Sequence, residues 1–146
     1  MDNFNFWHKW LLVTSIILIT FGLGMAFFNQ SAVFNQTFNN QINPAFWGHT
    51  QIDGRITHFQ GWIYGVLGAT VAGWGVMVFF IIQYPFKNRQ RWAWTACALS
   101  IGVWYAVDTW ISLAFGVYFN ALFNTLLLLL FALPLIFTRS HFNEHQ

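Results

Sequence analysis

A carboxylate lies inside an apolar stretch of the chain, "WYAVDTWISLAFGVYFNALFN" at residues 104–124. Asp108 is this carboxylate, and two amides, Asn120 and Asn124, follow it. A charged side chain at the centre of a membrane-spanning helix costs about 2.5–3.5 kcal/mol on insertion scales, so Asp108 is expected to be partnered or protonated. Such a residue either serves a ligand, a proton or an ion, or ties helices together by hydrogen bonds. The sequence leaves both interpretations open.

Helical spacing groups further polar residues with this carboxylate. Tyr105, Asp108 and Ser112 share one face of a helix, and Asn120 and Asn124 share one face of the next. Asp108 lies eight residues, or about 12 Å, from the expected end of its helix, and Asn124 falls at nearly the same depth if the two helices form a hairpin. We therefore expect a polar, ligand-binding pocket formed by Asp108, Tyr105, Ser112, Asn120, Asn124 and, from the preceding connection, His58.

Metal and cofactor chemistry have weaker support in the sequence. Imidazole and carboxylate groups bind zinc or iron, which makes His49, Asp53 and His58 weak metal candidates. Glycines flank this segment and no HExxH pattern is present, so we predict no metal and no cofactor. No catalytic residue can be named, and the single cysteine, Cys97, excludes a disulfide within the chain.

The composition requires that most of the chain be surrounded by lipid. Hydrophobic residues make up 57% of the 146 residues and charged residues only 7%, whereas a soluble domain carries about 25% charged residues. Aromatic residues reach 21%, and Trp and Tyr are typical of membrane interfaces. The few basic residues are scattered, which argues against nucleic-acid binding.

Four apolar stretches have the length of about 20 residues that a membrane-spanning helix needs. They cover about 10–28, 62–84, 94–115 and 117–137, with Pro85 expected to stop the second and Gly116 to turn the chain between the last two. The segment 29–61 is expected to be an ordered loop outside the membrane. The predicted fold is a single domain over 1–146, an all-α integral membrane four-helix bundle with up-down-up-down order.

Basic residues predict the orientation of these spans, because Lys and Arg favour cytoplasmic connections. Five of the six lie on one side of a four-span chain, and Arg55 alone lies on the other: the five are Lys9, Lys87, Arg89, Arg91 and Arg139. Both termini are therefore expected in the cytoplasm. An alternative is that the first span is a cleaved signal peptide, although its mainly apolar run of 19 residues exceeds the usual 7–15.

Small residues recur along the second span at spacings of four and three. This stripe consists of Gly61, Gly65, Gly68, Ala72 and Gly75. Small residues let helices approach closely in lipid. The stripe indicates packing within the bundle, a homo-oligomer contact, or a flat cavity for a ligand ring.

The motif "RWAW" at 91–94, followed by Asp108, Ser112 and the two asparagines, resembles small four-span bacterial membrane proteins. We expect an integral protein of the bacterial inner membrane. The first hypothesis is a binding or accessory protein for a lipid head group, a quinone or another small amphipathic ligand. The alternatives are a membrane enzyme using Asp108 with His58 or His49 as acid and base, and an oligomeric proton or ion conductor.

Overall fold

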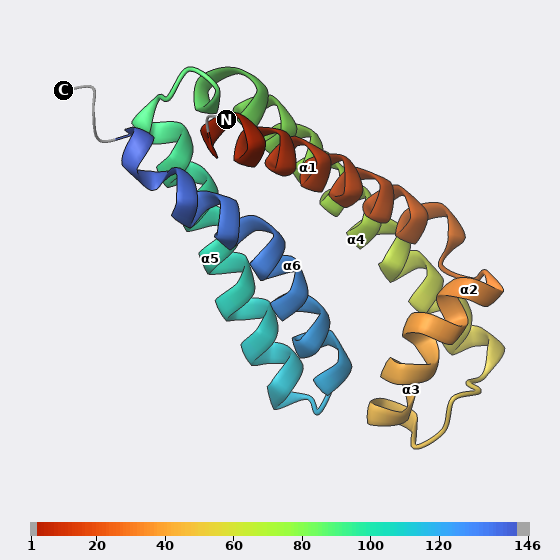
Figure 1. Cartoon of the computed structure of the whole chain (residues 1–146). Coiled ribbons are helices and arrows are strands. Elements are labelled where there is room, and N and C mark those ends of the chain that lie inside the picture. The colour runs from red at the N-terminus through yellow and green to blue at the C-terminus, as the bar shows by residue number, and fades with distance from the viewer. Residues whose placement is uncertain (1–2, 143–146) are drawn as a thin grey trace.

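The computed structural model describes residues 3–142, and every regular element within that range is a helix. Four segments are long and apolar enough to cross a membrane (Figure 1). They are α1 (Asn3–Phe28), α4 (Gly54–Ile81) with its π-helical continuation η2 (Ile82–Phe86), α5 (Arg91–Ala114), and α6 (Tyr118–Thr138) with the final turn η3 (Arg139–Phe142). The predicted all-helical class and the number of candidate spans are confirmed.

The second span differs most from its predicted boundaries. α4 begins at Gly54 rather than near residue 62, because Asp53 caps it: Oδ1 accepts a hydrogen bond from the Arg55 backbone N–H at 2.7 Å. Pro85 does not stop the helix, since the turn over Ile82–Phe86 widens and passes through the proline. The span therefore extends beyond the predicted limit at both ends.

The predicted loop over 29–61 is largely helical in the structure. It contains α2 (Ala32–Phe34), η1 (Asn35–Asn39) and α3 (Asn40–Trp47). Gly48 ends this run with a φ of 72°, a left-handed conformation that glycine adopts without steric cost. We call residues 29–53 the cap.

Amide side chains hold the cap in place, which explains why an Asn-rich segment is helical here. Asn29 Nδ2 donates to Gly61 O at 3.3 Å, and Asn39 Nδ2 donates to Asn29 O at 3.2 Å. Gln60 Nε2 donates to Asn43 Oδ1 at 2.8 Å. These bonds connect the cap to the beginning of α4 and join its first residue to η1.

The long helices form an open arc rather than a closed bundle (Figure 1). α1 packs along α4 on one flank and against α6 on the other, and α5 packs against α6. α4 and α5 contact each other only marginally, although they follow one another in the chain. The start of α1, the α4–α5 connection and η3 lie together at one end, here called the basic end, whereas the cap and the α5–α6 turn lie toward the other.

The outer surface of the arc is apolar. Phe27 is 77% exposed and Trp110 is 70% exposed, and large apolar side chains are exposed on every long helix. Extended apolar surface of this kind marks a region that contacts lipid or another protein rather than water. The described part of the chain is thus compatible with an integral membrane protein.

Small residues bring α1 and α4 into backbone contact. A Cβ atom added at Gly68 would lie 2.5 Å from both Gly22 O and Ala26 N, and one added at Gly22 would lie 2.5 Å from Ala72 N. No side chain tolerates such distances. The two helices therefore meet without side chains between them, as small residues allow in lipid.

This contact bears on the interpretations of the small-residue stripe. At its centre the stripe is filled by α1 of the same chain, and near Gly75 an added Cβ would lie 3.1 Å from Ile19 N. At Gly65 more room remains, with Ala26 O 3.7 Å away. The centre of the stripe therefore packs inside the chain, which supports the packing interpretation. The homo-oligomer contact stays a prediction for the stripe, which consists of Gly61, Gly65, Gly68, Ala72 and Gly75.

We predict that Gly68→Ala destabilises the protein by about 1–3 kcal/mol, because the added methyl group overlaps the α1 backbone. Gly73→Ala is the matched control, since nothing lies within 4 Å of a Cβ at that position of the same helix. Thermal unfolding in detergent measures both. Equal Tm values for the two variants would contradict the close α1–α4 contact.

Ring N–H groups satisfy backbone oxygens where the helices are irregular. Pro134 has no N–H, so Leu130 O in α6 lacks its usual donor, and Trp10 Nε1 of α1 donates to this oxygen at 3.0 Å. At the widened turn η2, His8 Nε2 donates to Ile82 O at 3.1 Å. Each bond ties α1 to a neighbouring element.

A third ring donor ties α5 to α6. Trp94 Nε1 donates to Leu135 O at 2.8 Å, where α6 approaches its end. In hydrocarbon each unsatisfied backbone group costs several kcal/mol. The three ring donors therefore compensate for helix irregularities in the half of the molecule near the basic end.

The tie between Trp10 and the Pro134 turn is testable by a double-mutant cycle. Trp10→Phe should destabilise the protein by about 0.6–1.7 kcal/mol, the range of hydrogen bonds between membrane helices. In a Pro134→Ala background the same change should cost much less, because alanine supplies the missing N–H to Leu130 O. An equal loss of unfolding free energy in both backgrounds would refute the tie.

Candidate functional site

A hydrogen-bonded polar cluster joins α5 and α6. Asp108 Oδ1 accepts hydrogen bonds from Asn120 Nδ2 and Asn124 Nδ2, each at 2.9 Å, and from Ser112 Oγ at 3.2 Å. Ser112 and Asn124 are buried, whereas Asp108 and Asn120 are half-buried. We call these four residues the Asp108 cluster, and all four were predicted from the helical spacing.

The hairpin geometry brings the cluster together. α5 ends at Ala114, six residues after Asp108, so the carboxylate lies roughly 9 Å from the helix end. Gly116 then turns the chain with a φ of 72°, and α6 starts at Tyr118. This immediate return places the first turns of α6 beside the last turns of α5, which confirms the turn predicted at Gly116.

One oxygen of the Asp108 carboxylate is left without a hydrogen-bond donor among residues 3–142. Asp108 Oδ2 accepts no hydrogen bond and forms no ion pair within residues 3–142, and it is not fully buried. The amide nitrogens of Asn120 and Asn124 are used on Asp108 Oδ1, and their own side-chain oxygens accept no bond from the described residues. An open carboxylate oxygen suits a group with N–H or O–H donors or a positive charge.

Tyr105 does not join the cluster, contrary to the prediction. Its hydroxyl shares a hydrogen bond with Thr125 Oγ1 at 3.3 Å, in another link between α5 and α6. Thr109 does contact the cluster, because Asn124 Nδ2 donates to its Oγ1 at 3.4 Å. Both threonines were missed, although Thr109 shares a helix face with Tyr105 and each is the chain neighbour of a predicted residue.

The histidines of the α1–α4 region do not join the cluster either. His58 is exposed on α4, and no hydrogen bond connects it to Asp108. His49 Nδ1 donates to the backbone oxygen of Gln51, and Asp53 caps α4. Within residues 3–142 no group of three or more His, Cys, Asp or Glu side chains could hold a metal ion, so the weak metal candidates are not assembled into a site.

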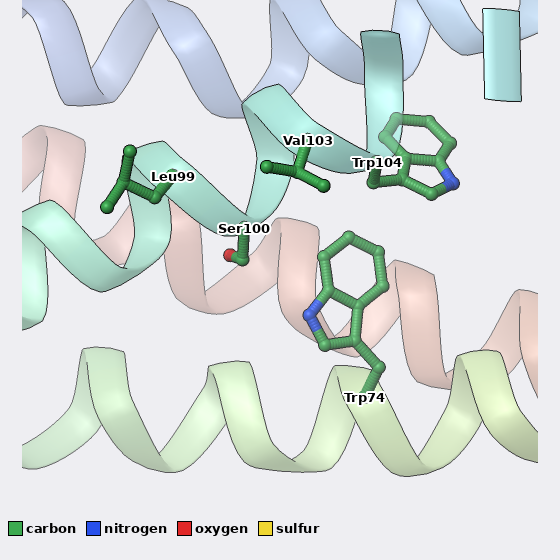
Figure 2. A pocket seen from close by; sticks show the side chains of 5 residues that line it. All are labelled: Trp74, Leu99, Ser100, Val103 and Trp104. Atoms are coloured by element: carbon green, nitrogen blue, oxygen red, sulfur yellow. The ribbon is translucent and has the colours of Figure 1, made fainter. Parts of the chain in front are cut away.

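An apolar groove of about 470 Å³ lies between α4 and α5 (Figure 2). Trp74 of α4 faces Trp104 of α5, with ring centroids 6.0 Å apart. Leu99, Ser100 and Val103 complete the α5 wall. Ser100 is the one polar side chain among these lining residues, and its Oγ donates to a backbone oxygen of its own helix at 3.1 Å. The groove follows from the open arc, whose two ends are α4 and α5.

This groove ends close to the Asp108 cluster. Trp104 and Asp108 are four residues apart on α5, so they lie on one face of the helix about one turn apart. Asp108 lines neither this groove nor a second cavity at the basic end. The cluster is therefore a polar patch beyond one end of the groove.

The cap positions the part of α6 that carries the two asparagines. Phe38 of η1 packs against Phe21 of α1 with centroids 5.7 Å apart. The same ring lies edge-on to Phe119 and Phe123 of α6, at 5.6 and 5.4 Å. These rings join the cap to both α1 and α6 near the cluster.

No protein-family model matches the chain, and no curated protein or solved structure matches it at a significant level. The interpretation of function therefore depends on the residues and their arrangement.

We predict that Asn124→Leu destabilises the protein by about 1–3 kcal/mol, because it removes a buried donor from the Asp108 carboxylate. The loss should be much smaller in an Asp108→Leu background, since replacing both partners by apolar groups can be nearly neutral. Unfolding free energies in mixed micelles measure the coupling. The absence of coupling would mean that this hydrogen bond does not stabilise the hairpin.

Proposed function

We propose that this chain is an integral membrane binding or accessory protein for a small amphipathic ligand. The ligand's head group would bind the Asp108 cluster, and its apolar part would lie in the groove between Trp74 and Trp104. A head group with N–H or O–H donors fits the open carboxylate oxygen of the cluster. Lipid head groups with an ammonium group and the hydroxyl groups of a quinol both belong to this class.

The unused oxygen of Asp108 is the observation that carries this proposal. Three donors converge on Oδ1, which holds the carboxylate in one orientation. Oδ2 has no partner in residues 3–142 and retains access from outside. A held carboxylate with one open oxygen, next to an apolar groove, is the arrangement expected of a site that recognises a donor at the end of an apolar molecule.

The orientation in the membrane follows from charge. Lys9, Lys87, Arg89, Arg91 and Arg139 belong to the basic end, and an excess of Lys and Arg favours the cytoplasmic side. Both termini would then lie in the cytoplasm, and the cap and the Asp108 cluster would lie in the outer half of the membrane. A bacterial inner membrane is the setting that we propose.

The other two functions have less support. An enzyme with Asp108 and a histidine as acid and base needs the two groups within reach of each other, and neither His49 nor His58 hydrogen-bonds to Asp108. A conductor needs a polar path through the basic half, where Ile82 and Phe86 are fully buried in the apolar core. We therefore favour binding.

The proposal predicts selective loss of binding in Asp108→Asn. Asparagine keeps an oxygen for the two amide donors, so the fold should survive, but it loses the charge and the second oxygen. The probe is dodecylammonium, whose head has three N–H donors, compared with dodecyltrimethylammonium, which has none. Calorimetric titration in a fixed detergent should show at least about tenfold weaker dodecylammonium binding in the variant, because bonds to charged groups contribute about 1.5–3 kcal/mol.

Asp53→Asn is the matched control, since it makes the same substitution at the residue before the first turn of α4 and should leave dodecylammonium binding unchanged. Dodecyltrimethylammonium should bind the wild type weakly, and its affinity should fall little in the Asp108→Asn variant. Equal dodecylammonium affinity in the wild type and in a folded Asp108→Asn variant would contradict the proposal. Equal affinity of the wild type for both probes would contradict recognition through donors.

A further inference from the structure

A second groove, of about 550 Å³, lies at the basic end between the end of α4 and the start of α5. Its composition changes along its length. Met77, Phe80 and Ile81 form the part beside the interior of α4, whereas Tyr84 and Asn88 lie near the connection. The groove is therefore apolar at its deep end and polar at its mouth.

Two exposed basic side chains, those of Lys87 and Arg91, flank the polar mouth of the groove. Both are chain neighbours of lining residues. The Arg89 guanidinium between them lies over the Phe4 ring, 4.9 Å from its centroid. Asp53 and Asp108 are the only acidic residues among residues 3–142, and both belong to the cap half of the molecule. Among these residues, no carboxylate neutralises the mouth.

The start of α5 adds to this field. Gln90 precedes the helix and forms no side-chain cap; instead its Oε1 accepts a bond from Trp92 Nε1 at 2.7 Å. The positive end of a 24-residue helix thus lies at the groove mouth, where Gln90 and Trp92 are lining residues. The helix dipole and the basic side chains therefore both make the electrostatic potential at the groove mouth more positive.

The aromatic residues fix the depth of this groove in the membrane. Tyr84 and Trp92 line it and are more than half exposed, at 58% and 56%. Such rings prefer the level of the lipid head groups. In a bilayer the mouth would then lie at the level of lipid phosphates, and the deep end would lie at the level of acyl chains.

We infer that this groove binds one anionic phospholipid. Its phosphate would lie at the mouth, within reach of Lys87 and Arg91, and an acyl chain would lie along Phe80 and Met77. Charge complementarity selects an anionic head group, and the apolar deep end selects a lipid over a soluble phosphate ester. The inference is independent of the Asp108 cluster, which belongs to the other half of the molecule.

The test uses the full chain in nanodiscs or detergent with phosphatidylglycerol or phosphatidylcholine at equal mole fraction, and native mass spectrometry counts the retained lipid. The wild type should retain one phosphatidylglycerol in preference to phosphatidylcholine. The double variant Lys87→Gln/Arg91→Gln should retain it about 25-fold less, since each basic residue near the surface contributes about fivefold. Glycerol phosphate, which lacks acyl chains, should not compete.

Lys9→Gln is the matched control, because it removes one charge from the basic end but not beside the groove. It should change retention less than twofold. If Lys9→Gln lowered phosphatidylglycerol retention about fivefold, as each charge removed in the double variant does, the inference would be overturned. Such a loss would indicate diffuse attraction of anionic lipid to the whole basic surface. Equal retention of both lipids by the wild type, or displacement by glycerol phosphate, would overturn it as well. A Phe80→Ala variant should weaken phosphatidylglycerol retention with all charges present, and unchanged retention would contradict a bound acyl chain.

Discussion

Backbone contact between α1 and α4 determines the shape of the molecule. Gly22 and Gly68 let these helices meet without intervening side chains, as close packing in lipid favours. α1 then turns its other flank to α6, and α6 provides the main contact for α5. α4 and α5 are left as the two ends of an arc, so the groove between Trp74 and Trp104 is a consequence of tight packing elsewhere and not a local defect.

Different chemistry holds the two halves of this arc. Near the basic end, ring N–H groups of His8, Trp10 and Trp94 bond to carbonyl oxygens at irregular turns and helix ends. In the cap, amide side chains bond to backbone and to one another. Both solutions meet the same requirement, because a backbone or amide group buried away from water must find a partner. Few side chains near the basic end can donate a hydrogen bond, so each ring N–H donor there lies opposite one particular carbonyl oxygen.

The sequence was sufficient to predict the number of candidate spans, because their length and apolar composition reveal them. It also predicted that Asp108, Ser112, Asn120 and Asn124 lie together, because helical spacing places them on facing sides of a hairpin. It was not sufficient for the cap, where Asn residues are typical of turns but here their amide side chains hydrogen-bond neighbouring elements and hold helical segments in place. Spacing also cannot give helix rotation, which is why Tyr105 was assigned to the cluster although it pairs with Thr125. The groove was out of reach as well, since consecutive helices usually pack together and α4 and α5 do not.

The choice of a carboxylate at residue 108 is not explained by helix packing alone. An asparagine there could accept the same bonds from Asn120 and Asn124 through one oxygen, without the cost of placing a charged side chain in a membrane-spanning helix. Of the two carboxylate oxygens, only Oδ1 takes part in joining α5 to α6. What the aspartate adds is Oδ2 and a negative charge, and neither has a partner among residues 3–142. The fold leaves this costly part of the side chain unused, and this is the reason for which we propose a ligand that uses it.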